Sequence, residues 1–255
     1  MNQGVTVLQS PLNCCKTDQI QASIYDILFQ AENGNLALIS THNEALQSQI
    51  AAAVDALKRG GVVGIPTDTL YGLAACVFDD DAVRRVFDLK GRPANMPMPV
   101  LLARAGDMGN CVMGDVPEAA IRLAERFWPG ALTLVLKRST AISDIVSAGG
   151  DTVALRVPNH PVPRQLAEGL GAPITGTSAN RSGEPGLTTA KAVRYVFGDE
   201  LEIVVEAGEI LGGVASTVLD LSGGRPVLLR QGAVSQEDIE DTLGVNLTKE
   251  TGTVS

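Results

Sequence analysis

The chain has 255 residues, of which 45% are hydrophobic and 19% are charged, and its net charge at pH 7 is −9. This composition is typical of a globular α/β protein and argues against a general nucleic-acid binder, whose domain is expected to be basic. No apolar run approaches the ~18 residues of a membrane span, no signal peptide is recognisable, and the four cysteines follow neither a disulfide nor a zinc pattern, so we expect a cytoplasmic protein.

The negative charge lies at the two ends of the chain. Residues 1–57 contain one lysine and five acidic residues, and residues 231–255 contain the same numbers. Residues 58–230 hold 18 basic and 19 acidic residues, so the middle of the chain is nearly balanced. Cations gathered at a central site would therefore be able to bind a small anionic ligand.

Residues 1–41 form an N-terminal extension to which the sequence assigns no role. Ile20, Ile24 and Ile27 have helical spacing, and this helix is open to two readings, an extension packed on the core or a partner-binding helix. From residue 42 the pattern is stronger, and it predicts a helix that ends at Gly60-Gly61. We place an α/β domain at residues 42–243 and a frayed polar tail at residues 244–255.

The segment Gly61–Pro93 places polar side chains at the end of a strand. The apolar run 62–65 predicts a strand that ends at Pro66, because proline cannot donate to a sheet ladder. Thr67 and Asp68 follow at once. The sequence therefore predicts a polar loop at this strand end.

The second half of that segment is predicted to be a helix. Asp79-Asp80-Asp81 are suited to cap it, and Gly91 is suited to end it. Lys90 and Arg92 flank that glycine, so two cations come at the end of the helix. A polar strand tip beside two cations suits a substrate with a small polar part and an anionic part.

The remaining elements alternate between strands and helices. The predicted helices begin at Pro117, Pro161, Thr188 and Gln236. The predicted strands cover residues 99–103, 131–137, 152–157, 173–178, 202–206, 216–221 and 227–230. We expect one α/β fold with a twisted mixed parallel and antiparallel sheet and flanking helices.

Several familiar active sites are excluded. The chain has no G-x-x-x-x-G-K-[ST] loop and no G-x-G-x-x-G after a strand. Its two histidines, His42 and His160, are predicted to be surface or capping residues rather than bases. Ser178 lacks a G-x-S-x-G context, which disfavours a serine hydrolase.

Polar residues at strand ends are the remaining candidates for a site, because ligands of open α/β sheets bind outside the carboxyl ends of strands. Each has an alternative structural reading as a turn residue or an ion-pair partner. Cations that end separate elements fit the recognition of phosphate and carboxylate. The candidates are Thr67, Arg156, Ser178, Asn180, Ser216, Thr217 and Arg230.

An ordered set of motifs carries a resemblance to a known family. The chain contains IPTDTLYGLA, KGRP, ALRVP, TSANRSGEP, STVLD and LLRQGA, in that order, between about residue 42 and about residue 240. This combination resembles the YrdC-type L-threonylcarbamoyladenylate synthases, in a short form with the synthase core only. The resemblance implies a YrdC-like fold, a twisted mixed sheet around a deep concave cleft.

The resemblance also implies a reaction. L-Threonine, bicarbonate and ATP, the last with Mg²⁺, would give L-threonylcarbamoyladenylate and pyrophosphate for threonylcarbamoyladenosine modification of tRNA. A transient contact with the tRNA threonylcarbamoyl transferase and weak RNA binding are further implications. No protein nucleophile is needed, because positioning and charge stabilisation suffice for such a transfer.

The family's residue roles carry over to matching positions. The threonine pocket would be formed by Thr67, Tyr71, Arg156, Gly176 and Ser216. Lys90 and Arg92 would be the catalytic cations on the ATP phosphates. The rest of the nucleotide side would be lined by Thr152, Ser178, Asn180 and Arg230.

Two other functions stay open from the sequence. One is an RNA-binding module of the same fold, and the other is a paralogue that acts on another carbamoyl or adenylyl substrate. The chain also departs from many relatives after KGRP, where it reads ANMPMPVLLA in place of a proline-rich step followed by histidine. Asp68 is a candidate base or metal contact and equally a strand-end cap.

Overall fold

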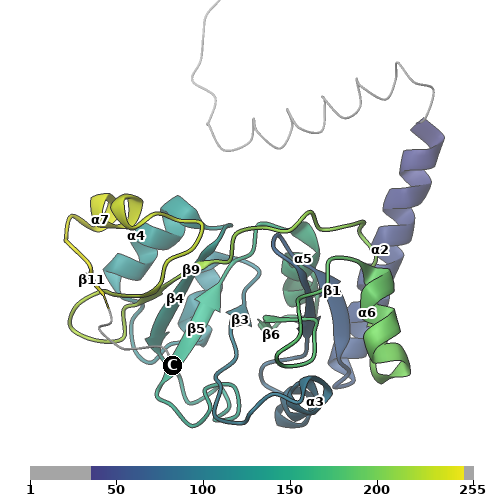
Figure 1. Ribbon diagram of the computed structural model, residues 1–255, viewed down its shortest axis with the longest axis horizontal. Coiled ribbons are helices and arrows are strands. Elements are labelled where there is room, and N and C mark those ends of the chain that lie inside the picture. The colour runs from purple at the N-terminus through teal and green to yellow at the C-terminus, as the bar shows by residue number, and fades with distance from the viewer. Residues whose placement is uncertain (1–35, 250–255) are drawn as a thin grey trace, which may run out of the picture. The chain divides into compact units, whose positions relative to one another are not determined.

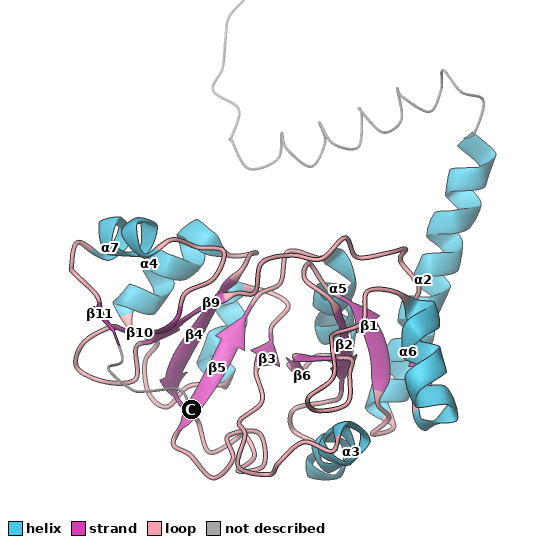
Figure 2. Ribbon diagram, in the orientation of Figure 1, coloured by secondary structure: helices cyan, strands magenta, loops and turns pink. Residues whose placement is uncertain are grey.

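The computed structural model describes residues 36–249 (Figures 1 and 2). Its first element is helix α2 (Leu36–Lys58), which begins six residues before the predicted start at residue 42. The contact pattern separates residues 1–45 from residues 46–255, and the α/β fold belongs to the second unit. The helix predicted around Ile20 lies outside the described residues.

A four-stranded sheet has the order β7-β2-β1-β8. In it β1 is antiparallel to β2 and parallel to β8, and β2 is antiparallel to β7. The strands are β1 (Val63–Pro66), β2 (Tyr71–Ala74), β7 (Thr177–Ser178) and β8 (Ile203–Val204).

A seven-stranded sheet has the order β11-β10-β9-β4-β5-β3-β6, with parallel and antiparallel pairs mixed. The predicted fold class is thus confirmed, although the strands form two sheets rather than one. The strands are β3 (Val100–Leu101), β4 (Leu132–Lys137), β5 (Thr152–Arg156), β6 (Ile174–Thr175), β9 (Thr217–Asp220), β10 (Val227–Arg230) and β11 (Thr248–Lys249).

Helices cover both sheets. Helices α5 and α6 contact β1 of the smaller sheet, and α4 contacts α7 beside the larger one (Figure 1). Apolar side chains pack into two buried clusters, one centred on α3, α4, β4 and β5 and the other on α2, α5 and β1. The helices are α3 (Asp80–Lys90), α4 (Glu118–Phe127), α5 (Pro161–Leu170), α6 (Ala190–Phe197) and α7 (Gln236–Leu243), with 3-10 turns η1 (Ala105–Asn110) and η2 (Gly198–Glu200).

Local signals set the ends of α3 as predicted. The Asp79 carboxylate accepts a hydrogen bond from the Ala82 backbone N–H, which caps the first turn. Gly91 ends the helix with φ of 57°, in the left-handed region that glycine adopts at little cost. The cap of α6 is Thr189 rather than the predicted Thr188.

The predicted strand 173–178 is divided between the two sheets. Its first part, β6, pairs with β3, whereas β7 pairs with β2. The break falls at Gly176, whose N–H donates to the Pro99 carbonyl at 2.7 Å. A Cβ at Gly176 would lie 2.7 Å from Cγ of Leu101, so only glycine fits this crossing.

The predicted frayed tail contains an element that the sequence did not indicate. Thr248–Lys249 forms β11, which pairs in parallel with β10 at Val227 and Leu228. Among residues 36–249, no helix has the length and apolar character needed to cross a membrane.

Candidate active site

Two cavities lie where the sheets meet, and they share part of their walls. The larger has a volume of about 600 Å³. The smaller, of about 70 Å³, is enclosed by the loop after β1 and by the β6–β7 crossing. Arg156, Gly176 and Ser178 line both, so the cavities adjoin.

The structure brings most of the predicted site residues to these walls. Thr67 and Tyr71 line the smaller cavity. Arg92, Thr152, Ser216 and Arg230 line the larger one, and Arg156, Gly176 and Ser178 line both. Lys90 and Asn180 line neither cavity. The binding roles predicted for all of these residues stay predictions.

Strand alternation explains why β5 serves the larger cavity. Successive side chains of a strand point to opposite faces, so residues two apart share a face. Thr152, Ala154 and Arg156 line the cavity, whereas Leu155 between them is fully buried in the core. Thr152, which is predicted to bind the nucleotide, and Arg156, which is predicted to bind the substrate L-threonine, therefore lie on one face of one strand.

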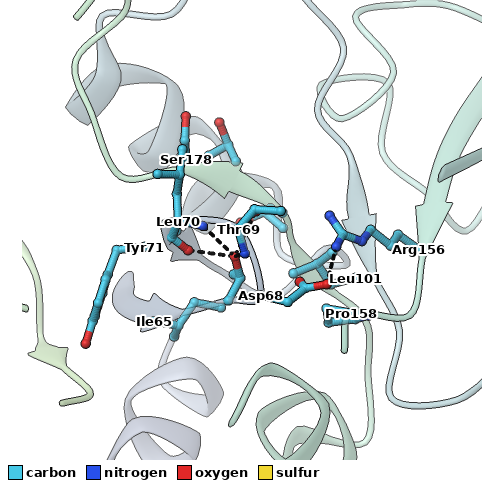
Figure 3. A pocket seen from close by; sticks show the side chains of 14 residues that line it. Ile65, Asp68, Thr69, Leu70, Tyr71, Leu101, Arg156, Pro158 and Ser178 are labelled. Carbon is cyan, nitrogen blue, oxygen red and sulfur yellow. Dashed lines mark hydrogen bonds and ion pairs between the residues drawn. The ribbon is translucent and has the colours of Figure 1, made fainter. Parts of the chain in front are cut away.

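Arg156 is held by a buried ion pair. Its Nη2 lies 2.5 Å from Oδ2 of Asp68, and its Nε donates to the Gly130 carbonyl at 2.8 Å. The two side chains are only 10% and 16% exposed. Burial lowers the pKa of Arg156, and the Asp68 charge opposes that shift. Figure 3 shows the pair at the wall of the smaller cavity.

Asp68 links the two sheets through this pair. Its Oδ2 also accepts from the Asn159 backbone N–H at 3.2 Å, beyond the end of β5. Its Oδ1 is buried and has no hydrogen-bond partner among the described residues. A buried carboxylate oxygen without a partner is costly, so Asp68 depends on Arg156 for its charge balance. The sequence left Asp68 open between a cap and a functional contact.

The Thr67 hydroxyl is used inside its own turn. Its Oγ1 donates to the Leu70 carbonyl at 2.6 Å and accepts from the N–H groups of Thr69 and Leu70 at 3.2 Å. These bonds close the turn between β1 and β2 and so fix the position of Asp68 (Figure 3). Thr67 is thus a turn-forming residue on the wall of the smaller cavity.

Tyr71 is fully buried, and its hydroxyl donates to the Gly208 carbonyl at 2.9 Å. Burial raises its pKa. In Figure 3 its ring points to the side away from Arg156. The contacts of the hydroxyl are therefore to the loop after β8.

Ser216 and Arg230 form a connected group on the wall of the larger cavity. The Ser216 hydroxyl lies 2.8 Å from Oγ1 of Thr133 and accepts from Nη2 of Arg230 at 3.1 Å. Arg230 also donates to the Ser216 carbonyl through Nε and Nη2. Thr133 was missed from the sequence, although it alternates with buried leucines along β4 and so faces the cavity with Val135.

Arg92 completes a cationic lining. It donates to the carbonyls of Met96 and Pro97, at 3.3 and 2.8 Å, which holds it beside the cavity. Arg92, Arg156 and Arg230 all line the larger cavity, and its lining includes no carboxylate. The arrangement suits an anionic ligand such as a polyphosphate. No group of three or more His, Cys, Asp or Glu side chains among the described residues could hold a metal ion.

Lys90 lies behind the cavity wall. It is 3% exposed, and its ammonium donates to the carbonyls of Ser178 and Asn180 at 2.5 and 2.8 Å. Burial lowers its pKa to about 8, and the nearby Arg92 charge acts in the same direction. His160 accepts from the Val162 N–H at the start of α5, which confirms its predicted capping role.

Comparison with known proteins finds a family model and relatives that match most of the chain. Its residues 55–232 match the Sua5/YciO/YrdC family model, described as "Telomere recombination". It is 40% identical over 207 residues to the threonylcarbamoyl-AMP synthase of Pyrococcus abyssi, covering 81% of this chain and 61% of that protein. It is 42% identical over 197 residues to the Bacillus subtilis protein of the same name, with 77% and 57% covered.

A solved structure supports the same relationship. The crystal structure of P. abyssi Sua5 complexed with L-threonine superposes with a TM-score of 0.74 at 40% identity, covering 79% of this chain and 58% of that one. The chain thus spans about three fifths of the length of these relatives. The family match covers more than half of the chain, and the fold agrees with it. This protein belongs to the Sua5/YciO/YrdC family.

Proposed function

We propose that this protein forms L-threonylcarbamoyladenylate and pyrophosphate from L-threonine, bicarbonate and ATP. The observation that carries the proposal is the pair of adjoining cavities. The smaller is lined by the buried ion pair of Arg156 and Asp68, and the described residues that line the larger include three arginines and no carboxylate. The relatives named threonylcarbamoyl-AMP synthase support this reading.

The smaller cavity would bind threonine. Arg156 would pair with the amino-acid carboxylate, while Asp68 holds its guanidinium in place through Nη2. Gly176 lets the chain cross close to this position because it has no side chain. The P. abyssi relative has been solved with L-threonine, which agrees with this assignment.

The larger cavity would bind ATP. Arg92 and Arg230 would neutralise phosphate oxygens, and Thr152 and Ser178 would line the nucleotide side. Mg²⁺ would enter as part of the MgATP substrate and share the phosphate charge, which fits the lack of carboxylates in this lining.

Two bond-forming steps would follow. The threonine amine attacks the carbon of bicarbonate, with loss of water, to give a carbamate. A carbamate oxygen then attacks the α-phosphorus of ATP, and pyrophosphate leaves. The residues present can position the reactants and stabilise charge on the transferred group, which is what such a transfer requires. The product would then supply a transferase that modifies tRNA.

A pyrophosphate-release assay tests the proposal. The full chain is incubated with L-threonine, bicarbonate and MgATP, and then with each of the three left out in turn. Release is expected only with all three, together with a product of the mass of threonylcarbamoyladenylate. Release without threonine, or no release at all, would refute the proposal. An RNA-binding module without catalysis is not favoured, because the relatives bear the synthase name.

A further inference from the structure

Lys90 uses all three of its N–H donors inside the protein. Its Nζ donates to the Ser178 carbonyl at 2.5 Å, to the Asn180 carbonyl at 2.8 Å and to Oδ1 of Asn180 at 3.3 Å. An ammonium group has three donors and no acceptor. In this arrangement no donor of Lys90 is left for a phosphate oxygen.

Residues that follow β7 also donate hydrogen bonds to the end of α3. We define the 178–184 turn as residues 178–184, which begin with the last residue of β7. Arg181 of this turn donates through Nη1 to the Leu89 carbonyl at 2.9 Å, and the Ser182 N–H donates to the Lys90 carbonyl at 2.7 Å. The last residues of α3 and the 178–184 turn are therefore joined from both sides.

Asn180 is a second organiser of this turn. Its Oδ1 accepts from the Ser178 hydroxyl as well as from Lys90, and its Nδ2 donates to the carbonyls of Arg181 and Glu184, both at 2.8 Å. The four bonds fill its amide group, which has two donors and an oxygen acceptor. Asn180, like Lys90, lines neither cavity.

Of Lys90, Asn180 and Ser178, it is Ser178 that lines the cavities in which the ligands are proposed to bind. It lines both cavities, and its carbonyl is held by Lys90 and its hydroxyl by Asn180. Arg92, only two residues after Lys90, lines the larger cavity directly. Gly91 therefore separates Arg92, which lines the cavity, from Lys90, which is bonded to the turn.

We propose that Lys90 is a positioning residue, which acts on ATP through the 178–184 turn rather than by contact with phosphate. The inference rests on the proposed function, because it assigns ATP to the larger cavity. The buried charge is satisfied by three oxygen acceptors, and its removal takes one donor from each of them. The turn then loosens, and Ser178 loses its fixed place at the wall shared by the two cavities.

A double-mutant cycle tests this role on ATP binding. The variants are Lys90→Met, Asn180→Ala and their combination, and the dissociation constant of MgATP is measured by calorimetry without threonine. Two changes that act through one element are not additive, whereas independent changes are. We expect each single change to weaken binding about tenfold, which is about 1.4 kcal/mol, and the double variant to bind no more than about twofold more weakly than the worse single variant. A roughly hundredfold loss in the double variant would overturn the proposal.

A matched cycle supplies the control. Lys90→Met is combined with Arg230→Gln, because Arg230 lines the cavity from β10 and its hydrogen bonds to described residues go to Ser216, outside the turn. Here the losses are expected to multiply. Because both cycles are read from ATP binding alone, they do not depend on whether adenylate forms.

Hydrogen exchange provides a readout that needs no ligand. The amides of Ala179, Ser182 and Glu184 are hydrogen-bonded at this turn. We expect Lys90→Met to speed their exchange at least tenfold, and Arg92→Gln to leave it unchanged. Unchanged exchange in Lys90→Met would refute the role of Lys90 in holding the 178–184 turn.

An NMR measurement on the wild-type protein tests the proposal even if Lys90→Met does not fold. A buried ammonium that donates three hydrogen bonds exchanges its protons slowly, so its ¹⁵Nζ signal is observable in lysine-labelled protein. The signal is expected to stay in place when MgATP is added. A large shift on titration, as a direct phosphate contact would produce, overturns the proposal.

Discussion

The two cavities are built in different ways. The wall of the smaller one contains a single local turn, closed by the Thr67 hydroxyl, and one ion pair that reaches across to β5. The larger one collects separate side chains from strands β4, β5, β9 and β10 and from the end of α3. The smaller cavity therefore depends on a few strongly coupled contacts, whereas the larger depends on many weakly coupled ones.

This difference predicts how each cavity responds to substitution. A change in the smaller cavity should damage folding and threonine binding together, because its groups are buried and paired. A change in the larger cavity should weaken ATP binding with little effect on folding.

Arg156→Met is expected to have the largest effect. It leaves the Asp68 carboxylate buried without its counter-charge, and breaking a buried ion pair costs about 3 kcal/mol or more. Threonine affinity should fall on the order of a hundredfold. Urea denaturation and calorimetry measure the two losses.

Lys137→Met is the matched control for that change. Lys137 pairs with Asp151 at 2.7 Å, but the two side chains are 45% and 77% exposed. An exposed pair is screened by solvent and contributes little, so stability should change little. Equal losses in both variants would contradict the coupling that we assign to the Arg156–Asp68 pair.

The lowered pKa of Lys90 predicts that the stability of the protein depends on pH. Its pKa in the folded protein is about 8, below the ordinary value of 10.5. As pH rises from 8 toward 10.5 the folded state loses this proton before the unfolded state does. The free energy of unfolding therefore rises in this window relative to a protein without the group.

The measurement compares the wild-type protein with Lys90→Met. Urea denaturation at pH 8 and at pH 9.5 should show the difference between their free energies of unfolding move in favour of the wild type by about 1.5 kcal/mol. The slope reaches about 1.4 kcal/mol per pH unit only once the folded state has lost the proton. No movement across this window would mean that the pKa of Lys90 is not lowered by its burial.

Arg92→Gln should affect ligand binding without affecting folding. Removing one charge-assisted contact to phosphate is expected to raise the dissociation constant of MgATP about tenfold. Arg84→Gln, an exposed change on helix α3, which ends just before Arg92, is the control and should alter neither quantity. A matching loss of melting temperature in Arg92→Gln would show that Arg92 is structural instead.

Tyr71→Phe is expected to have the smallest effect. The change leaves the Gly208 carbonyl without its 2.9 Å donor and should cost about 1 kcal/mol of stability. Because the ring points away from Arg156, threonine affinity should stay the same (Figure 3). A tenfold loss of threonine affinity would instead support the predicted role of Tyr71 in the threonine pocket.

Much of the secondary structure could be predicted from local patterns. Helix α5 begins at the predicted Pro161, and Asp79 and Gly91 delimit α3 as expected, because caps and stops act within one turn of chain. Strand β11 was not predicted, since two residues carry no periodicity and their pairing with β10 is a long-range contact.

The crossing between the sheets shows the limit of pattern reading. Residues 173–178 look like one strand in the sequence. Their division at Gly176 depends on the approach of Pro99 and Leu101, which are distant in the sequence. No local pattern carries that information.

The family, most of the elements and the polar residues at the strand ends are recognisable in the amino-acid sequence, because motifs, caps and periodicity are properties of short segments. Which of those residues meet a cavity follows from the tertiary structure. Arg92 and Lys90 are alike in charge and two residues apart, yet one lines the larger cavity and the other holds the 178–184 turn. That assignment depends on the packing of α3 against a turn some ninety residues later, where a buried ammonium finds carbonyl acceptors that charge and spacing could not reveal.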